Sequence, residues 1–344
     1  MTSPAHQPLE GVRFVEFDGL GPTPFAAMML ADLGAVGIRV TGPPRGNMGL
    51  GAGAQVYHRG REVRALDLKS DEGKAAALEL IREADLLVEG FRPGVMERLG
   101  LGPETCLSLR PSLVYGRVTG HGQRGPASSS GGHDINYLAA VGALDLFRRE
   151  GERPVPPLNL VADFAGGGLM LVVGMLAAHV DARTSGRGRV VDAAMTDGVA
   201  ALLGSVSGRL ADGSWSPTPG TNLLDTGAPF YDVYETSDGR FVAVGAIEQK
   251  FYDAFLEGLG LGQDELPDRW DRATWPLLRE IFTRRFHEES FDTWRVAFAD
   301  RDACVTPVLS LPEAQTDPVL RERATYVELD GVVQPGPAPR FTWR

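Results

Sequence analysis

Short apolar runs alternate with longer segments of helical periodicity through the first third of the chain. Strands are predicted at residues 12–17, 37–40, 86–89 and 113–117, and helices at 25–33 and after Ser70. A strand, a helix and a second strand in succession imply parallel pairing, because the chain must cross over before the next strand begins. The pattern therefore predicts an α/β fold whose large domain is Rossmann-like and doubly wound.

Capping signals support the first two helices. Thr23 is predicted to cap the first helix, with Pro24 as its first helical residue. Ser70 is predicted to cap the second, where Asp71 and Glu72 favour the positive end of the helix dipole.

The pattern changes in the second half of the chain. After residues 190–195, a helical segment reaches to about residue 210, and a Gly/Ser/Pro-rich stretch follows at 212–220. Strands at 230–236 and 241–244 flank a turn and predict a hairpin, and helices follow near 250–259 and 275–286. We therefore expect a large domain over 1–190, a helical linker over 191–225, a smaller α+β domain over 226–315, and a C-terminal return to the large domain over 316–344.

The composition is that of an ordinary globular protein, with 43% apolar and 23% charged residues among 344. The net charge of −11 argues against a nucleic-acid partner, which attracts basic proteins. The longest apolar stretch, 164–178, is shorter than the roughly 20 residues that span a bilayer and contains four glycines, so we expect a buried helix and no membrane partner. Two distant cysteines and an N-terminus without signal-peptide features predict a cytoplasmic protein.

Common cofactor and metal motifs do not fit. The turn after the first strand has Gly19 and Gly21, but Pro24 occupies the third glycine position of the dinucleotide fingerprint. The sequence has no phosphate-binding P-loop and no nucleophile elbow, and its six histidines lack familiar metal-ligand spacing. We therefore expect no metal and no bound cofactor.

Ten segments in order along nearly the whole chain resemble one family. They are Ala31–Ala35, Leu66–Lys69, Phe91–Val95, Arg98–Gly102, Thr119–Gln123, Gly132–Tyr137, Pro157–Phe164, Gly227–Tyr231, Gly245–Glu248 and Asp302–Val308. Together they resemble the family III CoA-transferases, also called the CaiB/BaiF family. The Gly-His-Asp-Ile-Asn-Tyr segment is similar to the branch that inverts 2-methylacyl-CoA thioesters, since the transferase branch tends to carry tyrosine where His133 stands.

The resemblance implies an interlocked homodimer, with the active site between the large, CoA-binding domain of one chain and the small domain of the other. It implies an isomerase whose substrate is an acyl-CoA thioester, so that CoA is part of the substrate. His133 and Asp163 would be the two acid/base groups, a pairing that suits proton removal and return. Glu248 would hydrogen-bond His133 and set its orientation.

Alternatives from the residues themselves remain open. Asp163 precedes an apolar helical segment, so an N-cap role is the stronger interpretation without the resemblance. The backbone N–H groups beside it would then be available to an enolate oxygen. The glycines at 166–168 serve close approach of substrate or helix packing equally well. Gly132, Asp134, Asn136 and Tyr137 are candidate substrate-binding residues, with Asp134 a possible support and the last two possible packing residues.

The phosphates of CoA require basic partners, for which Arg39, Lys69, Arg92 and Arg98 are candidates, although isolated surface charges are the usual alternative. The sequence departs from the family at Gly42, where an arginine is usual, and Arg45 is a candidate substitute. A second departure is His121, which replaces the usual Trp or Phe.

Three functions remain in competition. The first is a 2-methylacyl-CoA racemase, which the histidine motif favours. The second is a CoA-transferase with Asp163 as nucleophile. The third is a non-catalytic relative that binds acyl thioesters, suggested by the arginine missing at Gly42.

Overall fold

A computed structural model describes residues 7–42 and 56–342. These fall into two compact units. The larger comprises the described residues of Met1–Ala143, Pro156–Gly204 and Val319–Arg344, and the smaller comprises Leu144–Val155 and Ser205–Pro318. The expected boundaries differ, because 144–155 belongs to the smaller unit and the expected linker at 191–225 is divided between the two units.

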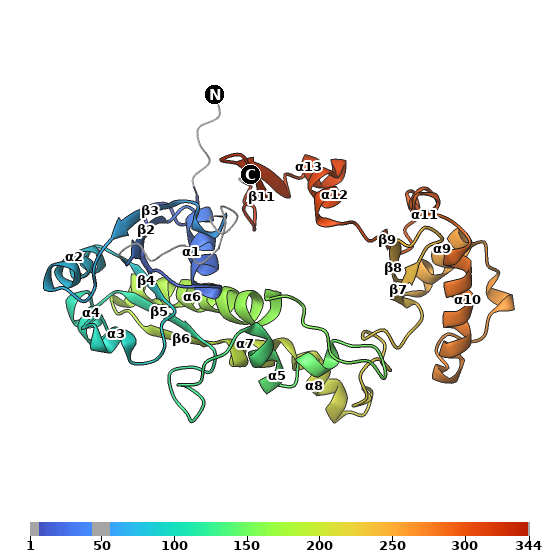
Figure 1. The fold of residues 1–344 in the computed structure, drawn as a ribbon, viewed down its shortest axis with the longest axis horizontal. Helices are drawn as coiled ribbons and strands as arrows, with labels where there is room; N and C mark the ends of the chain where they lie inside the picture. The colour runs from blue at the N-terminus through green and yellow to red at the C-terminus, as the bar shows by residue number, and fades with distance from the viewer. Residues whose placement is uncertain (1–6, 43–55, 343–344) are drawn as a thin grey trace. The chain divides into compact units, whose positions relative to one another are not determined.

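The larger unit alternates strands and helices as expected (Figure 1). Its elements are β1 (Arg13–Phe17), α1 (Pro22–Asp32), β2 (Val36–Thr41), β3 (Arg61–Ala65), α2 (Asp71–Arg82), β4 (Leu86–Glu89), α3 (Val95–Arg98), α4 (Pro103–Leu109), β5 (Val114–Thr119), α5 (Asp134–Ala140), the π-helix η3 (Leu160–Leu169), α6 (Met170–Ser185), β6 (Val190–Ala194), α7 (Met195–Leu202), β10 (Tyr326–Leu329) and β11 (Val332–Pro335).

The described strands β1–β6 form one parallel sheet in the order β3-β2-β1-β4-β5-β6. The predicted doubly wound α/β fold is confirmed. The strand order reverses between β1 and β4, and ligands of such sheets bind beyond the carboxyl ends of the strands at this reversal. The loops after β1, β4 and β5 are therefore where a site is expected.

Helices cover both faces of this sheet. α2, α3 and α4 enclose a core on one face that includes Ile81, Met96 and Cys106. On the other face, α1 packs against β1, β2 and β4, and α6 packs against β5 and β6. A methyl group at Gly116 of β5 would lie 2.4 Å from the sulfur of Met175, so this glycine permits the close approach of α6.

The helical stretch Leu160–Ser185 is long and apolar enough to cross a membrane, judged by length and composition alone. One side of it nevertheless lies in the protein core, where Leu171, Val172 and Met175 are buried. Its position against β5 and β6 is that of a core helix, as the sequence predicts.

One predicted cap is confirmed and the other is wrong. Ser70 accepts a 3.0 Å hydrogen bond from the backbone N–H of Gly73 at the start of α2. Thr23 does not cap α1, which begins one residue earlier at Pro22 and has Gly21 at its N-cap position. The backbone conformation at Gly21 has φ of 60°, which glycine adopts without strain.

The smaller unit contains the predicted hairpin. Its elements are η2 (Leu144–Leu146), α8 (Gly204–Ala211), β7 (Tyr231–Glu235), β8 (Phe241–Gly245), α9 (Gln249–Leu259), η4 (Gln263–Glu265), η5 (Arg272–Thr274), α10 (Trp275–His287), α11 (Phe291–Phe298), β9 (Val305–Pro307) and α12 (Leu311–Thr316), with α13 (Pro318–Glu322) at the boundary. Among the residues described, β7, β8 and β9 form an antiparallel sheet. Aromatic side chains such as Phe255, Phe282 and Phe286 fill its core.

The C-terminal segment packs on the larger unit. Its hairpin β10–β11 is reached by Arg59, whose guanidinium donates to the side chain of Gln334 at 3.0 Å and to the carbonyl of Pro335 at 2.8 Å. The same guanidinium forms an ion pair with Asp32 of α1. This one arginine therefore connects the C-terminal hairpin to the first helix.

Candidate active site

Asp163 lies in the first turn of η3, beside the loop that leads from β1 to α1. A methyl group at Gly21 would lie 2.9 Å from Asp163 Oδ2, so the carboxylate rests directly against the backbone of this loop. Asn159 occupies the N-cap position of η3. The interpretation of Asp163 as the N-cap is therefore wrong, and its carboxylate is free of a capping role.

Asp134, the first residue of α5, supports the start of η3. Its Oδ2 accepts hydrogen bonds from the backbone N–H groups of Ala162 at 2.7 Å and Asp163 at 2.9 Å. The expectation that these N–H groups are available to an enolate oxygen is therefore wrong, because Asp134 already occupies both. Asp134 is 3% exposed, so it supports η3 from the protein interior.

Asp163 is half-buried, and burial raises its pKa. The charge of Asp134 raises the pKa further, whereas a 3.2 Å hydrogen bond from Asn159 Nδ2 and the charge of His133 lower it; the net shift is upward. A carboxyl group with a raised pKa holds a proton closer to neutral pH, which suits alternate proton removal and return. Since Asp134 directly follows His133, its bonds to the start of η3 bring Asp163 to the segment that carries His133.

His133 is exposed and stands at the N-cap position of α5. Its backbone N–H donates to Asn136 Oδ1 at 3.0 Å, which fixes the entry of the chain into the helix. Asn136, predicted to bind substrate, thus holds the backbone of His133. Because the side chain of His133 is open to solvent, it is accessible to a ligand.

Tyr137 packs against the segment that carries His133. Its hydroxyl donates to the carbonyl of Gly132 at 2.7 Å, and the ring of His121 meets its ring edge-to-face at 5.3 Å. Burial raises the pKa of Tyr137, as does the charge of Asp163, while Arg92 lowers it. Gly120 must remain glycine here, since a methyl group would lie 2.1 Å from the tyrosine ring.

The four candidate phosphate-binding residues have different surroundings. Arg92 is exposed, and a methyl group at Gly131 would lie 3.0 Å from its Nη2, so its guanidinium lies beside the loop that leads to His133. Arg39 on β2 instead pairs with Asp18 through two hydrogen bonds of 2.5 and 3.2 Å. Lys69 and Arg98 are exposed side chains that follow β3 and β4 in the chain.

The departure at position 42 leaves open space. Gly42 directly follows β2, and a methyl group there would meet nothing within 4 Å among the described residues. Arg45, the candidate substitute, lies outside the described residues.

The glycines at 166–168 serve packing: methyl groups there would contact Val199, Met195 and Phe25 at 2.9, 2.8 and 2.6 Å. They let η3 approach α7 and α1 closely.

Glu248 belongs to the smaller unit, where it stands at the N-cap position of α9. Its side chain is exposed and caps no backbone group of that helix. An exposed carboxylate without a capping role is available to a partner. Its predicted bond to His133 stays a prediction.

Sequence reasoning missed two features of the site. The first is the hydrogen bond from Asn159 to Asp163, whose spacing of four residues places two side chains on the same side of a helix. The second is Gly21, which in sequence belongs to an incomplete dinucleotide-binding motif and in the fold lies against the Asp163 carboxylate. No local pattern connects residue 21 with residue 163, so only the folded chain reveals this contact.

Known proteins resemble this chain over nearly its whole length. A family model described as CoA-transferase family III matches residues 9–344. An alpha-methylacyl-CoA racemase of Mus musculus is 46% identical over 331 residues, covering 96% of this chain and 85% of that protein. The racemase of Homo sapiens is 44% identical over 334 residues, covering 96% and 86%.

More distant relatives carry a different activity in their names. A succinate–glutarate CoA-transferase of Agrobacterium fabrum is 29% identical over 358 residues, covering 96% of this chain and 88% of that protein. Among solved structures, a CAIB/BAIF family protein from Brucella suis superposes with a TM-score of 0.84 at 23% identity, covering 98% of this chain and 93% of the other. This likeness concerns the fold.

Proposed function

This chain belongs to the CoA-transferase family III, and we propose that it is an isomerase that inverts the α-carbon of 2-methylacyl-CoA thioesters. The observation that carries the proposal is the hydrogen bond from the Asp163 N–H to Asp134, the residue after His133, which brings Asp163 to the segment that carries His133. Burial there raises the pKa of the Asp163 carboxyl group. The names of the mouse and human relatives support the same chemistry.

The reaction needs two groups on opposite faces of one carbon. The carboxylate of Asp163 removes the α-proton, and the electron pair of the broken C–H bond moves into the thioester as an enolate. A protonated His133 then donates its proton to the other face and forms the new C–H bond. The opposite epimer reacts in the reverse order, with His133 as base and Asp163 as acid.

The proposed test follows hydrogen at the α-carbon. One epimer of a 2-methylacyl-CoA is incubated with the protein in deuterated water, and incorporation at the α-carbon is measured by mass spectrometry. We expect deuterium uptake and formation of the other epimer without a second CoA substrate. If no deuterium is taken up, the racemase hypothesis is contradicted. The non-catalytic binding protein and the CoA-transferase would then remain as the alternatives.

Two substitutions locate the activity. His133→Ala and Asp163→Ala are each expected to abolish epimerisation, whereas His287→Ala, an exposed histidine of α10, serves as the matched control. An adduct on Asp163 trapped by hydroxylamine, together with dependence on an acceptor acid, would instead establish a CoA-transferase.

We also propose an interlocked homodimer in which the small domain of one chain completes the site of the other. Exposed apolar side chains on the η3–α6 stretch support a partner surface: Leu169, Val173 and Val180 are 38%, 62% and 68% exposed. Light scattering that reports a monomer in solution would contradict this proposal.

Co-expression of an inactive and an impaired variant tests the shared site. A dimer of His133→Ala and Glu248→Ala chains has one site with both defects and one site with neither, if each site combines two chains. Activity should therefore return in the mixed dimer. If each chain holds a complete site of its own, both sites remain defective and activity stays lost.

A further inference from the structure

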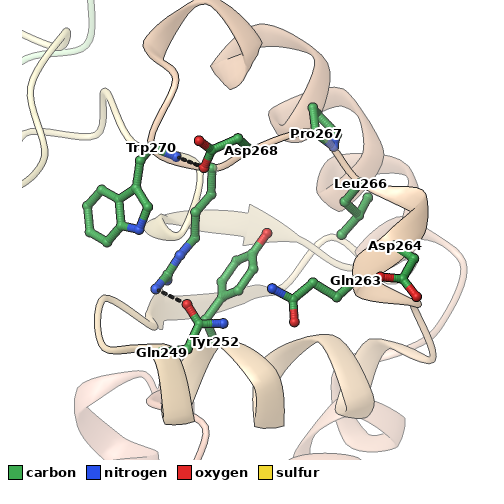
Figure 2. A pocket seen from close by; sticks show the side chains of 9 residues that line it. Gln249, Tyr252, Gln263, Asp264, Leu266, Pro267, Asp268 and Trp270 are labelled. Atoms are coloured by element: carbon green, nitrogen blue, oxygen red, sulfur yellow. Dashed lines mark hydrogen bonds between the residues drawn. The ribbon is translucent and has the colours of Figure 1, made fainter.

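A polar cavity of about 400 Å³ lies in the smaller unit, between the start of α9 and the segment before α10. Its lining includes Arg269, Gln249 and Tyr252 (Figure 2). Arg269 is 5% exposed, an unusual burial for an arginine. It forms no ion pair with a carboxylate of the described residues, so its guanidinium serves another purpose.

The guanidinium of Arg269 binds residues that precede and follow Glu248 in the chain. Its Nη1 donates to the carbonyl of Ala246 at 3.0 Å, and its Nη2 donates to the side chain of Gln249 at 3.1 Å. Figure 2 shows the second bond as a dashed line that ends on the labelled Gln249. Glu248 lies between Ala246 and Gln249 in the chain, so these two bonds hold the backbone that carries it.

Aromatic rings fix the guanidinium in this place. Its central carbon lies 4.2 Å from the ring centre of Tyr252, 4.7 Å from that of Trp270 and 5.1 Å from that of Phe230. Such contacts stabilise a cation and restrict its orientation. A planar donor held by three rings makes a rigid support for the turn between β8 and α9.

We propose that Arg269 is a positioning residue that fixes the turn Ala246–Gln249 and thereby presents the carboxylate of Glu248 in one orientation to the catalytic histidine. The inference rests on the proposed function. The acid/base group itself needs no contact with Arg269. Arg269 instead holds the Glu248 carboxylate in place beside the histidine. A displacement of such a group by about 1 Å can cost on the order of 100-fold in rate.

The first test compares Arg269→Ala and Arg269→Lys with the wild type. We expect kcat for α-proton exchange to fall on the order of 10- to 100-fold in Arg269→Ala, with KM little changed. Arg269→Lys keeps the charge without the two-pronged geometry and should lie between them. Arg272→Ala is the matched control, since Arg272 is three residues away and donates to Ser214 instead.

The pH profile separates positioning from simple loss of structure. A carboxylate beside an imidazole stabilises its protonated form, so a displaced Glu248 should shift the histidine limb of the kcat profile to lower pH. Glu248→Ala should give the same shift, and the double variant should be no worse than Glu248→Ala alone. The inference would be overturned if kcat fell by the same factor at every pH. It would also be overturned if the losses of the two single variants added fully in the double variant.

Chemical rescue supplies a third readout. Arg269→Ala leaves the aromatic cage beside an existing cavity, so added guanidinium should restore activity in that variant and leave Glu248→Ala unchanged. Full activity of Arg269→Ala without rescue would contradict the role. Failure of the wild type to exchange the α-proton would instead overturn the proposed function, which keeps the two outcomes distinct.

Discussion

The carboxylate of Asp134 accepts a hydrogen bond of 2.9 Å from the backbone N–H of Asp163. One acidic residue thus fixes the backbone of another, across two helices that lie 29 positions apart at this contact. Since Asp134 directly follows His133 in the chain, the same bond also ties the two predicted acid/base groups together.

Replacement of Asp134 tests this link. Asp134→Ala leaves the buried N–H of Ala162 and the part-buried N–H of Asp163 without an acceptor, so we expect the free energy of unfolding to fall by about 2–3 kcal/mol. Exchange activity should fall as well, because the start of η3 loses its support. Urea unfolding measures the first effect. Unchanged stability would show that these two bonds add nothing to the fold.

The charge state of Asp163 affects stability in a direction set by its raised pKa. A folded-state pKa above the unfolded value means that the fold favours the protonated form, so stability falls as pH rises from the usual range of an aspartate through the raised pKa. Asp163→Asn removes this penalty. The variant should match the wild type in melting temperature at low pH and exceed it at neutral pH.

Exposed Asp264→Asn is the control for the loss of one negative charge. The Asp163→Asn variant should also lose α-proton exchange, because an amide cannot carry the proton. A lower melting temperature for Asp163→Asn at neutral pH would contradict the role of burial.

Gly21 is expected to tolerate no side chain. In Gly21→Ala the positive φ costs about 1–3 kcal/mol, and the methyl group presses on Asp163 Oδ2, which should also reduce exchange activity. Gly11→Ala is the matched control, since Gly11 has φ of +86° and no neighbour within 4 Å in the part of the chain that the structure describes. It should lose stability only. Equal activity losses in both variants would argue against the contact with Asp163.

The buried ion pair of Glu16 and Arg61 is expected to make a large contribution to stability. Both side chains are 0% exposed and their atoms lie 2.9 Å apart. Arg61→Met leaves a buried carboxylate without its partner, so urea unfolding should show a loss of about 3–5 kcal/mol. The double variant with Glu16→Gln should recover part of this loss. A double variant less stable than Arg61→Met would contradict the explanation.

The sequence predicted those parts of the fold that depend on neighbouring residues. The apolar run at 86–89 has the bounds of β4, and Ser70 caps α2, because burial of a short run and capping of a helix are local events. The order of strands with crossover helices was sufficient to predict the doubly wound sheet. The resemblance of ten segments in order along nearly the whole chain was sufficient to identify the family.

Tertiary structure decided what depends on distant partners. β3 was not predicted, because its residues Arg61–Ala65 are mostly charged and exposed and only pairing with β2 makes them a strand. The sequence alone favoured Asp163 as a cap, whereas the fold gives the N–H groups at this helix start to Asp134. A side chain that satisfies a backbone group 28 or 29 positions away leaves no periodic signal, so such contacts appear only once the chain has folded.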